Sequence, residues 1–304
     1  MPNHIVRRLP NLLVIGAQKC GTTWLYEQLR RHPYIYFSEI KELSFFGKRE
    51  SNRDLEAYGA NFTGAGNERY VAEATPGYFW ARDSSRKFFG SGPRQLRLAT
   101  PQAVRETLGP DVKLILSLRH PVHRSVSAFM HHFRRGRIKP EDRITDLLER
   151  LVDFEFRFGI IEMGFYQRHF LPWERVFGPN KILTLFTDDI RSDPVSALGR
   201  VAAFLDLPPG DIDGADETIH SGPKLAISDN ALTIDATDPR TRKMLRENNQ
   251  GKAFPRISRD EILELQEIYT PDIAFIEQRF RRPDLGWHIA RQLEDFVNTR
   301  SPAR

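Results

Sequence analysis

The sequence has a single cysteine, Cys20, among its 304 residues, so an internal disulfide is excluded. It also lacks an apolar run of about 18 residues, the length that a membrane-spanning helix requires. Near the start, the stretch NLLVIGAQ has an apolar core of only about five residues, which is too short for a signal sequence. These absences lead us to expect a cytoplasmic protein without a membrane span.

The chain also has no long block of one charge and no metal-binding pattern. Lys and Arg number 45 against 40 Asp and Glu, for a net charge of +5, and the densest basic cluster, His131–Arg137, is short. This mild excess suits a small anionic ligand at least as well as a nucleic acid. His131 and His132 are adjacent and diverge on a helix, so they cannot share a metal ion. We expect neither a nucleic-acid partner nor a metal.

Short β-branched and aliphatic runs alternate with helical patterns along the chain. The expected strands are Leu12–Ile15, Ile35–Phe37, Tyr70–Ala72, Lys113–Leu118 and Lys181–Phe186. The expected helices are Thr22–Arg31, Pro101–Leu108, Val122–Arg134, Asp142–Phe158, Met163–Val176, Pro194–Leu205, which starts after the N-cap Asp193, and a last helix that starts at a capping box of Ser258 and Glu261. Because no tight hairpin turns separate the strands, the pattern predicts an α/β fold with a central parallel β-sheet flanked by helices.

Residues 208–255 interrupt this alternation. The segment has weak periodicity and many Asp, Gly and Pro residues. A stretch of this length without strong elements is more typical of a functional cover than of a domain linker. We therefore expect one domain, residues 1–304, in which 208–255 form an irregular cover over the ligand cleft and influence ligand choice.

The segment NLLVIGAQKCGTTWLYEQL, residues 11–29, has the pattern of a strand, a glycine loop and a helix. Gly16 and Gly21 have the spacing of the phosphate-binding loop G-x-x-x-x-G-K-[ST], and Thr23 stands at the hydroxyl position. Glycines allow positive φ and close backbone approach. The first N–H groups of a helix lack intrahelical partners and attract anions. The segment predicts an anion site in a single P-loop-like domain.

The loop departs from the nucleotide-hydrolase pattern at its lysine. Thr22 occupies the lysine position, and Lys19 lies inside the loop. In nucleotide hydrolases the lysine contacts the β- and γ-phosphates, and the magnesium ion is also held by an Asp that ends a second strand. The strand KLILSL is followed instead by Arg119, which favours a second anion over a metal ion. Arg119, and Ser127 two turns along the next helix, are candidates for a second phosphate contact.

The segments GAQKCGTTWL and LSLRHPVHRSVSAF resemble the sulfotransferases that use 3′-phosphoadenosine 5′-phosphosulfate, especially the heparan-sulfate-type and related bacterial branch. The resemblance implies that Lys19–Thr23 hold the 5′-phosphosulfate end of the donor and that Arg119 and Ser127 hold its 3′-phosphate. A donor with a single 5′-phosphate needs no Mg²⁺ between β- and γ-phosphates, which explains the displaced lysine. The donor-binding residues implied are Gln18, Lys19, Cys20, Gly21, Thr22, Thr23, Trp24, Arg119, Ser127, Gly251 and Lys252.

Two further segments resemble the reaction centre of this family. EIKELSFFGK resembles K-E-P-x-F-F, whose glutamate is taken as the general base and corresponds here to Glu42. VAEATPGYF resembles E-K-x-P-x-Y-F, and the matching residues are Glu73, Thr75, Pro76 and Tyr78. The resemblance implies that Lys19 and Glu42 are catalytic. The acceptor-binding residues that it implies are Lys41, Phe46, Glu73 and Tyr78.

The sequence departs from the family pattern in two places. Ala74 replaces the lysine of E-K-x-P-x-Y-F, and Lys41 is the candidate to supply the missing charge. In QGKAFPRIS, which resembles the late loop K-G-R-x-H-P, Gly251 and Lys252 fit, whereas Gln250 replaces a lysine and Phe254 a histidine.

The leading hypothesis is a sulfotransferase that acts on an acceptor hydroxyl of a carbohydrate, a glycolipid or a small metabolite. A P-loop kinase is the alternative enzyme, and dependence on ATP and Mg²⁺ would distinguish it. The alternative that is not an enzyme is a module that binds a nucleotide without catalysis. The substitution at Ala74 allows this module, whereas the presence of Lys19 and Glu42 argues against it.

Overall fold

The computed structural model describes residues 8–48, 50–80, 99–149, 158–208, 224–239, 241–243, 253–287 and 293–297. Its contacts divide the chain into two compact units. The first comprises residues 1–118 and 168–219, and the second comprises residues 119–167 and 220–304. The first contains a parallel sheet, and the second contains a small antiparallel sheet.

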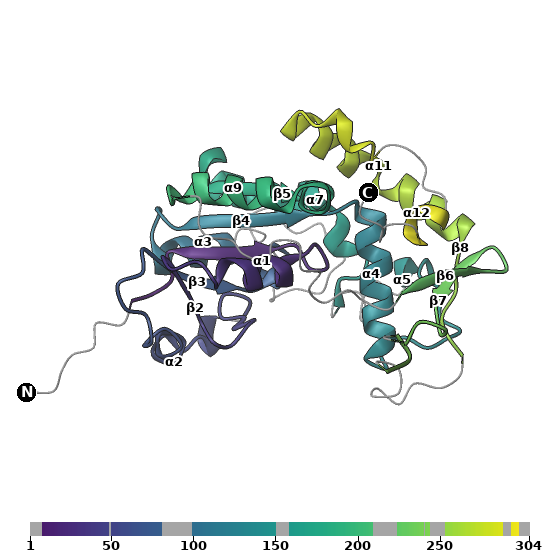
Figure 1. The fold of residues 1–304 in the computed structure, drawn as a ribbon, viewed down its shortest axis with the longest axis horizontal. Helices are drawn as coiled ribbons and strands as arrows, with labels where there is room; N and C mark the ends of the chain where they lie inside the picture. Colours follow the sequence, from purple (N-terminus) through teal and green to yellow (C-terminus); the bar gives the residue numbers. More distant parts are fainter. Residues whose placement is uncertain are drawn as a thin grey trace, which may run out of the picture. The chain divides into compact units, whose positions relative to one another are not determined.

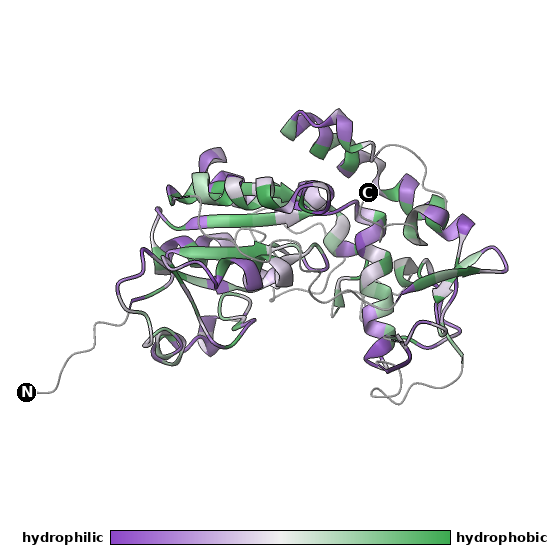
Figure 2. Cartoon of the chain, in the orientation of Figure 1, coloured by the Kyte–Doolittle hydropathy of each residue, from purple (hydrophilic) through white to green (hydrophobic). Residues whose placement is uncertain are grey.

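The five strands of the first unit form one parallel sheet (Figure 1). Their order is β2 (Ile35–Phe37), β3 (Tyr70–Ala74), β1 (Leu12–Gly16), β4 (Lys113–Leu118) and β5 (Ile182–Phe186), and every neighbouring pair is parallel. β1 and β3 are buried along their whole length, as expected when both faces of a sheet are covered. Figure 2 shows β1 and β4 as mainly apolar. The predicted strands and their parallel arrangement are confirmed.

The strand order places several loops at one edge of this sheet. Because parallel strands end at the same edge, the segments after β1, β2, β3 and β5 all leave from it. The chain passes from β1 to β2 on one side and later reaches β4 on the other side of β1. Ligands of such open sheets bind beyond the carboxyl ends of the strands, where the strand order reverses. The glycine loop after β1 lies at this point.

Two helices, α1 (Thr22–Leu29) and α9 (Pro194–Leu205), cover one face of the sheet. Their side chains pack with strand residues in a single core cluster, which includes Leu12, Val14, Leu25, Leu29, Ala72, Ile115, Leu185, Leu198, Val201 and Leu205. The predicted start of α9 is confirmed, because Asp193 accepts a hydrogen bond from Ser196 N. The other elements are α2 (Leu55–Ala60), α3 (Ala99–Leu108), α7 (Tyr166–Phe177, whose first two residues belong to the second unit), α8 (Thr187–Ser192) and 3₁₀ turns at Glu50–Asn52, Pro76–Tyr78 and Pro179–Lys181.

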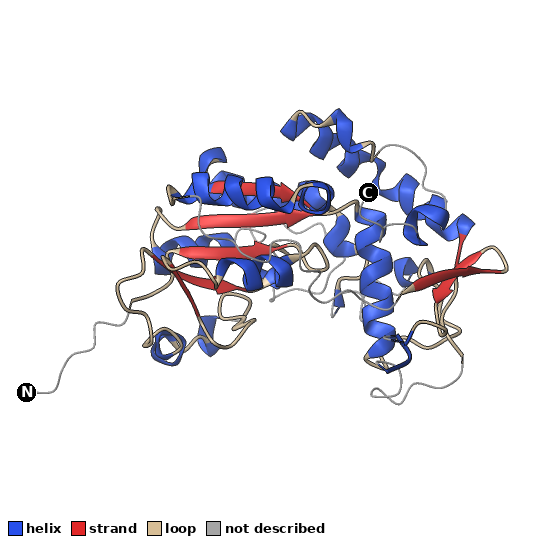
Figure 3. Ribbon diagram, viewed as in Figure 1, coloured by secondary structure: helices blue, strands red, loops and turns tan. Residues whose placement is uncertain are grey.

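In the second unit, α4 (Pro121–Arg134) packs against α11 (Arg259–Phe280) through a hydrogen bond of 2.7 Å between Ser125 Oγ and Tyr269 OH. α11 begins at the predicted capping box, in which Ser258 and Glu261 bond each other's backbone N–H. Figure 3 shows the antiparallel strands in red. The remaining elements are β6 (Leu225–Ser228), β7 (Ala231–Ile234), β8 (Ile257–Ser258), α5 (Asp146–Glu149), α12 (Leu293–Val297) and 3₁₀ turns at Glu162–Gly164 and Pro283–Leu285.

The hairpin of β6 and β7 corrects the expectation of irregular structure within 208–255, of which residues 209–223, 240 and 244–252 lie outside the described residues. Its two-residue turn, Asp229 and Asn230, has positive φ at both positions. Asp and Asn tolerate this conformation and are typical of such turns. Each strand has only four residues, so the alternation was too short to stand out in the sequence.

Two helix predictions also differ from the structure. Within the predicted helix Asp142–Phe158 the structure describes α5, and residues 150–157 lie outside the described residues. The helix predicted at Met163–Val176 starts later, as α7, because residues before it form a 3₁₀ turn. In this turn Gly164 lies against Tyr269, whose Cζ would be 2.6 Å from a Cβ.

Candidate functional site: the glycine loop and its surroundings

The loop between β1 and α1 presents an uncapped helix N-terminus. Gly21, the N-cap of α1, has φ 81°, which is the left-handed conformation that glycine adopts without strain. No side chain caps the first turn, and no acidic residue lies in it. The free N–H groups and the positive end of the helix dipole therefore remain available for an anion. Lys19, which is also left-handed at φ 69° and half-buried, adds a charge within the loop.

Gly16 has a different role from Gly21. A Cβ on Gly16 would lie 2.4 Å from Phe79 Cβ and 3.1 Å from Pro76 O. At the same place Phe79 N donates a hydrogen bond of 2.7 Å to Ile15 O. Gly16 therefore lets the segment after β3 approach the end of β1. The two expected uses of glycine are confirmed, with close approach at Gly16 and positive φ at Gly21.

The neighbouring strand β4 fixes the other side of the loop. Ser117 Oγ donates a buried hydrogen bond of 2.6 Å to Cys20 O, and Ala17 N donates to Ser117 O at 2.8 Å. Ser117 is the only hydroxyl in KLILSL. Sequence reasoning missed this residue, although a small polar side chain in an apolar strand is a signal of such a contact.

Seven consecutive residues, 18–24, are predicted to bind the donor, and the six other than Gly21 divide into two groups by burial. Gln18, Lys19 and Thr23 are half-buried, whereas the buried ones are Cys20, Thr22 and Trp24. The Cys20 thiol donates to Gln18 O at 3.6 Å inside the loop. Trp24 is 8% exposed and belongs to the core cluster beneath α1. The structure thus gives its ring a packing role, and its contact with the donor stays a prediction.

Buried polar atoms around the loop fit a polar ligand. Within the described part of the chain, Gln18 Oε1 and Thr187 Oγ1 are buried and have no hydrogen-bond partner. Thr187 follows β5, and its Cγ2 lies 3.8 Å from the place of a Cβ on Gly21. Buried polar atoms are normally satisfied by protein, water or ligand. The Thr187 hydroxyl can donate to a phosphate-bearing ligand at the loop, whereas the Gln18 carbonyl oxygen only accepts and needs a donor such as a hydroxyl group.

Lys41 connects the predicted base to the glycine loop. Its Nζ donates to Thr23 Oγ1 at 3.4 Å and lies 3.3 Å from Glu42 Oε1. Thr23 is in the first turn of α1, so this lysine adds positive charge where the helix dipole is already positive. The Glu42 side chain is 54% exposed, and its carboxylate is therefore accessible to an incoming molecule. The sequence could not show that Lys41 and Thr23 are in contact.

The backbone around Glu42 has an unusual conformation. Glu42 at φ 70° and Ser44 at φ 54° are both left-handed. Such conformations cost about 1–3 kcal/mol each in residues other than glycine, and surrounding contacts must hold them. Ser44 N donates to Thr75 Oγ1 at 3.2 Å, and Phe46 N donates to Tyr78 OH at 3.3 Å. The segment after β2 is thereby anchored to the residues after β3.

These two hydroxyl groups are bound in turn to a buried carboxylate, Glu73. Thr75 Oγ1 and Tyr78 OH each donate to Glu73 Oε1 at 2.7 Å, and Tyr58 OH donates to Oε2. Burial raises the pKa of the Glu73 carboxyl above its ordinary value, and the three hydroxyl groups oppose this effect. Burial and the charge of Glu73 raise the pKa of Tyr58 and Tyr78, so both phenols stay protonated and donate.

This burial changes the interpretation of the predicted acceptor residues. Glu73 is 0% exposed, and Phe46 and Tyr78 are each 1% exposed. The Phe46 ring packs against Tyr78 with centroids 5.5 Å apart. The structure places these three residues beneath the segment of Glu42, where they support it, in contrast to the predicted acceptor contact. Lys41, with 20% of its side chain exposed, is the predicted acceptor residue that remains accessible.

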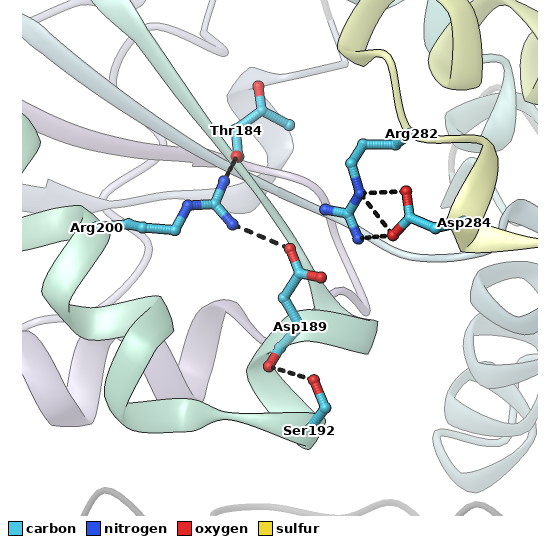
Figure 4. A network of polar contacts seen from close by, with 6 residues as sticks. All are labelled: Thr184, Asp189, Ser192, Arg200, Arg282 and Asp284. Atoms are coloured by element: carbon cyan, nitrogen blue, oxygen red, sulfur yellow. Dashed lines mark hydrogen bonds and ion pairs between the residues drawn. The ribbon is translucent and has the colours of Figure 1, made fainter.

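A polar network links α8 to α9, and α9 to β5 (Figure 4). Arg200 of α9 donates to Asp189 Oδ2 and to Thr184 O, both at 3.0 Å. Ser192 Oγ donates to Asp189 O at 3.1 Å. These contacts position α8, which begins at Thr187 beside the glycine loop. In the second unit, Arg282 forms a separate two-pronged ion pair with Asp284.

The predicted 3′-phosphate residues belong to the second unit. Arg119 directly follows β4, and its carbonyl accepts a hydrogen bond of 2.6 Å from Tyr166 OH. His120 caps α4 by accepting from Val122 N, and Ser127 lies half-buried on this helix. Gly251 and Lys252, also predicted to bind the donor, lie outside the described residues.

The described residues contain no group of three or more His, Cys, Asp or Glu side chains placed to hold a metal ion. No helix among them is both long enough and apolar enough to span a bilayer.

The parallel sheet, the glycine loop at its carboxyl edge and the uncapped helix define a P-loop-like protein that binds a phosphate compound. A family model described as the sulfotransferase domain matches residues 9–272, and the chain belongs to this family. It is therefore an enzyme that transfers a sulfuryl group. This membership decides against the kinase and the non-catalytic module.

Similar proteins agree with the assignment. Heparan sulfate glucosamine 3-O-sulfotransferase 6 of Homo sapiens is 25% identical over 293 residues, which cover 92% of this chain and 74% of that protein. Carbohydrate sulfotransferase 15 of Rattus norvegicus is 25% identical over 251 residues, covering 67% of this chain and 45% of that protein. A solved sulfotransferase from Alicyclobacillus acidocaldarius shares the fold, with a TM-score of 0.63 at 23% identity over 93% of this chain and 100% of that one.

Proposed function

We propose that the enzyme transfers the sulfuryl group of 3′-phosphoadenosine 5′-phosphosulfate to a hydroxyl of a carbohydrate, with Glu42 as general base. The observation that carries the proposal is the contact of Lys41 with both Glu42 and Thr23. It joins an exposed carboxylate to the anion-binding helix N-terminus. The names of the similar proteins, which include heparan sulfate and carbohydrate sulfotransferases, support a carbohydrate acceptor.

In this reaction the acceptor oxygen forms a bond to sulfur, and the bond from sulfur to the bridging phosphate oxygen breaks. Glu42 takes the hydroxyl proton, which is typically worth about 10²–10⁴-fold in rate. Lys19 and the N–H groups of α1 stabilise the charge that develops on the leaving 5′-phosphate. The products are a sulfate ester and adenosine 3′,5′-bisphosphate. No step requires a metal ion.

Further residues complete the proposed donor site. Arg119 and Ser127 hold the 3′-phosphate, as the sequence resemblance implies, and a guanidinium matches the geometry of such a group. Lys41 supplies the charge that the family places at the position of Ala74. The contact of Lys41 with Thr23 supports this role. Ala74 itself is buried at the end of β3.

The test of the base uses a donor labelled in its sulfonyl group, with a glucosamine-containing oligosaccharide as acceptor. Glu42→Gln should lower kcat by about 10²–10⁴-fold while the donor KM stays near that of the wild type. Glu39→Gln, which removes another exposed carboxylate nearby, is the matched control and should keep its turnover. An equal loss of turnover and donor affinity in Glu42→Gln would refute the role of Glu42. Label transfer to a phenol but not to any carbohydrate would refute the acceptor class alone.

A further inference from the structure

Glu73 is a buried charge that the proposed chemistry does not use. It lies in β3, a strand whose other residues are Tyr70, Val71, Ala72 and Ala74. Burial of a charged group is costly unless it is hydrogen-bonded. Glu73 receives three hydroxyl hydrogen bonds, two of them from the residues that hold the Glu42 segment. A carboxylate kept at this cost raises the question of its role.

The directions of the hydrogen bonds give the answer. A hydroxyl has one proton to donate and two lone pairs to accept with. A carboxylate only accepts, so Thr75 and Tyr78 must point their protons at Glu73. Their lone pairs then accept from the backbone N–H groups of Ser44 and Phe46. The charge of Glu73 thus fixes how both hydroxyls bind the segment.

The segment needs such support because its conformation is strained. Glu42 and Ser44 are both left-handed, and Leu43 lies between them. Ser44 and Phe46 lie shortly after Glu42 in the segment. The hydrogen bonds that their backbone N–H groups donate constrain the direction in which the Glu42 side chain leaves the backbone. Without them the segment would relax toward right-handed or extended conformations, and the carboxylate would move.

We propose that Glu73 is a positioning residue, which acts through the hydroxyls of Thr75 and Tyr78 to hold Glu42 where it accepts the proton of the acceptor. The proposal rests on the proposed role of Glu42. It requires no contact of Glu73 with donor or acceptor, in agreement with its complete burial. A displacement of about 1 Å in such a group can cost about a hundredfold in rate.

The network contains its own control. Tyr58 donates to the other oxygen of Glu73, but it meets the segment only through ring contacts, and its ring stacks on Phe45 at 4.2 Å. Tyr58→Phe therefore removes a buried hydroxyl beside Glu73 and keeps the ring. Tyr78→Phe removes a buried hydroxyl that also accepts from Phe46 N. Only Tyr78→Phe therefore removes a hydrogen bond that anchors the Glu42 segment.

The test measures kcat and donor KM in variants of the full chain. Thr75→Val and Tyr78→Phe should each lower kcat about tenfold, since each removes one of the two hydrogen bonds that anchor the segment and keeps the other. Their donor KM should stay within a factor of about two, and Tyr58→Phe should keep most of its kcat. Glu73→Leu should lose more turnover than Glu73→Gln, because the amide oxygen of glutamine can still accept from both hydroxyls. If Glu73→Leu does not fold, the two hydroxyl variants carry the test.

A double-mutant cycle with Glu42→Gln separates the possible failures. If Tyr78 acts through the base, Tyr78→Phe should lower kcat further by less than about twofold in the Glu42→Gln background. The same tenfold loss in both backgrounds would overturn the positioning role and leave the base intact. An equal loss of kcat in Tyr58→Phe and Tyr78→Phe would overturn it as well. Wild-type turnover in Glu42→Gln would refute the base itself, and this proposal with it.

Discussion

Replacing Gly16 by alanine should damage both the stability and the activity of the enzyme. The added Cβ would lie 2.4 Å from Phe79 Cβ, whereas ordinary contact begins near 3.4 Å. The end of β1 and the segment that carries Phe79 must therefore separate by about 1 Å, because a Cβ cannot rotate away from its own backbone. The hydrogen bond of 2.7 Å from Phe79 N to Ile15 O stands in the way of that movement.

The size of the effect follows from this geometry. Overpacking of a well-packed core typically costs about 1–3 kcal/mol. Each kcal/mol corresponds to about 2–4 °C in melting temperature for a domain of 150–250 residues. We therefore expect Gly16→Ala to melt several degrees below the wild type. The displaced segment also carries Tyr78, which holds Phe46 N, so kcat should fall more than the donor affinity.

The neighbouring Gly77 provides the matched control. It lies in the 3₁₀ turn next to Pro76, and a Cβ there would meet nothing within 4 Å. Thermal unfolding and steady-state kinetics of Gly16→Ala and Gly77→Ala should differ clearly, with Gly77→Ala close to the wild type. If both variants have the melting temperature of the wild type, the close approach to Phe79 is refuted as the reason for a glycine at position 16.

Three further predictions concern single contacts. Ser117→Ala should lose about 1 kcal/mol of stability, because it removes the bond of 2.6 Å to Cys20 O, and should weaken the donor Kd in calorimetry. Burial raises the pKa of Glu73 in the folded chain above the ordinary 4.5, so the folded chain binds more protons at Glu73 than the unfolded chain does. Relative to Glu73→Gln, the wild type should lose stability as the pH rises above about 4.5 in urea unfolding, and a gain would contradict this sign. Lys41→Met should weaken donor binding and turnover, whereas Lys48→Met, an exposed control, should change neither.

The parts of the site that local sequence patterns determine were predictable. The strand β1, the glycine loop and α1 are consecutive in the chain, and their hydrophobic pattern and glycine spacing predict them directly. The capping box at Ser258 and the N-cap at Asp193 are also local signals, and the structure confirms both.

The contacts that complete the site depend on the order of the strands. Lys41 follows β2 and Thr23 follows β1, and only the sheet brings them together. For the same reason the sequence showed Glu73 and Tyr78 as parts of a motif, but not that both are buried beneath Glu42. A charge within an otherwise apolar strand signals a buried role, and that signal was available in YVAEA.

Binding of adenosine 3′,5′-bisphosphate tests the proposed donor most directly. Thermal unfolding is measured with the bisphosphate, ATP, ADP and AMP, each with and without Mg²⁺. At a hundred times its Kd the bisphosphate should add about 2.7 kcal/mol of stability. We expect a shift of a few degrees that needs no Mg²⁺ and is lost in Arg119→Ala. A shift with ATP and Mg²⁺ but none with the bisphosphate would contradict it.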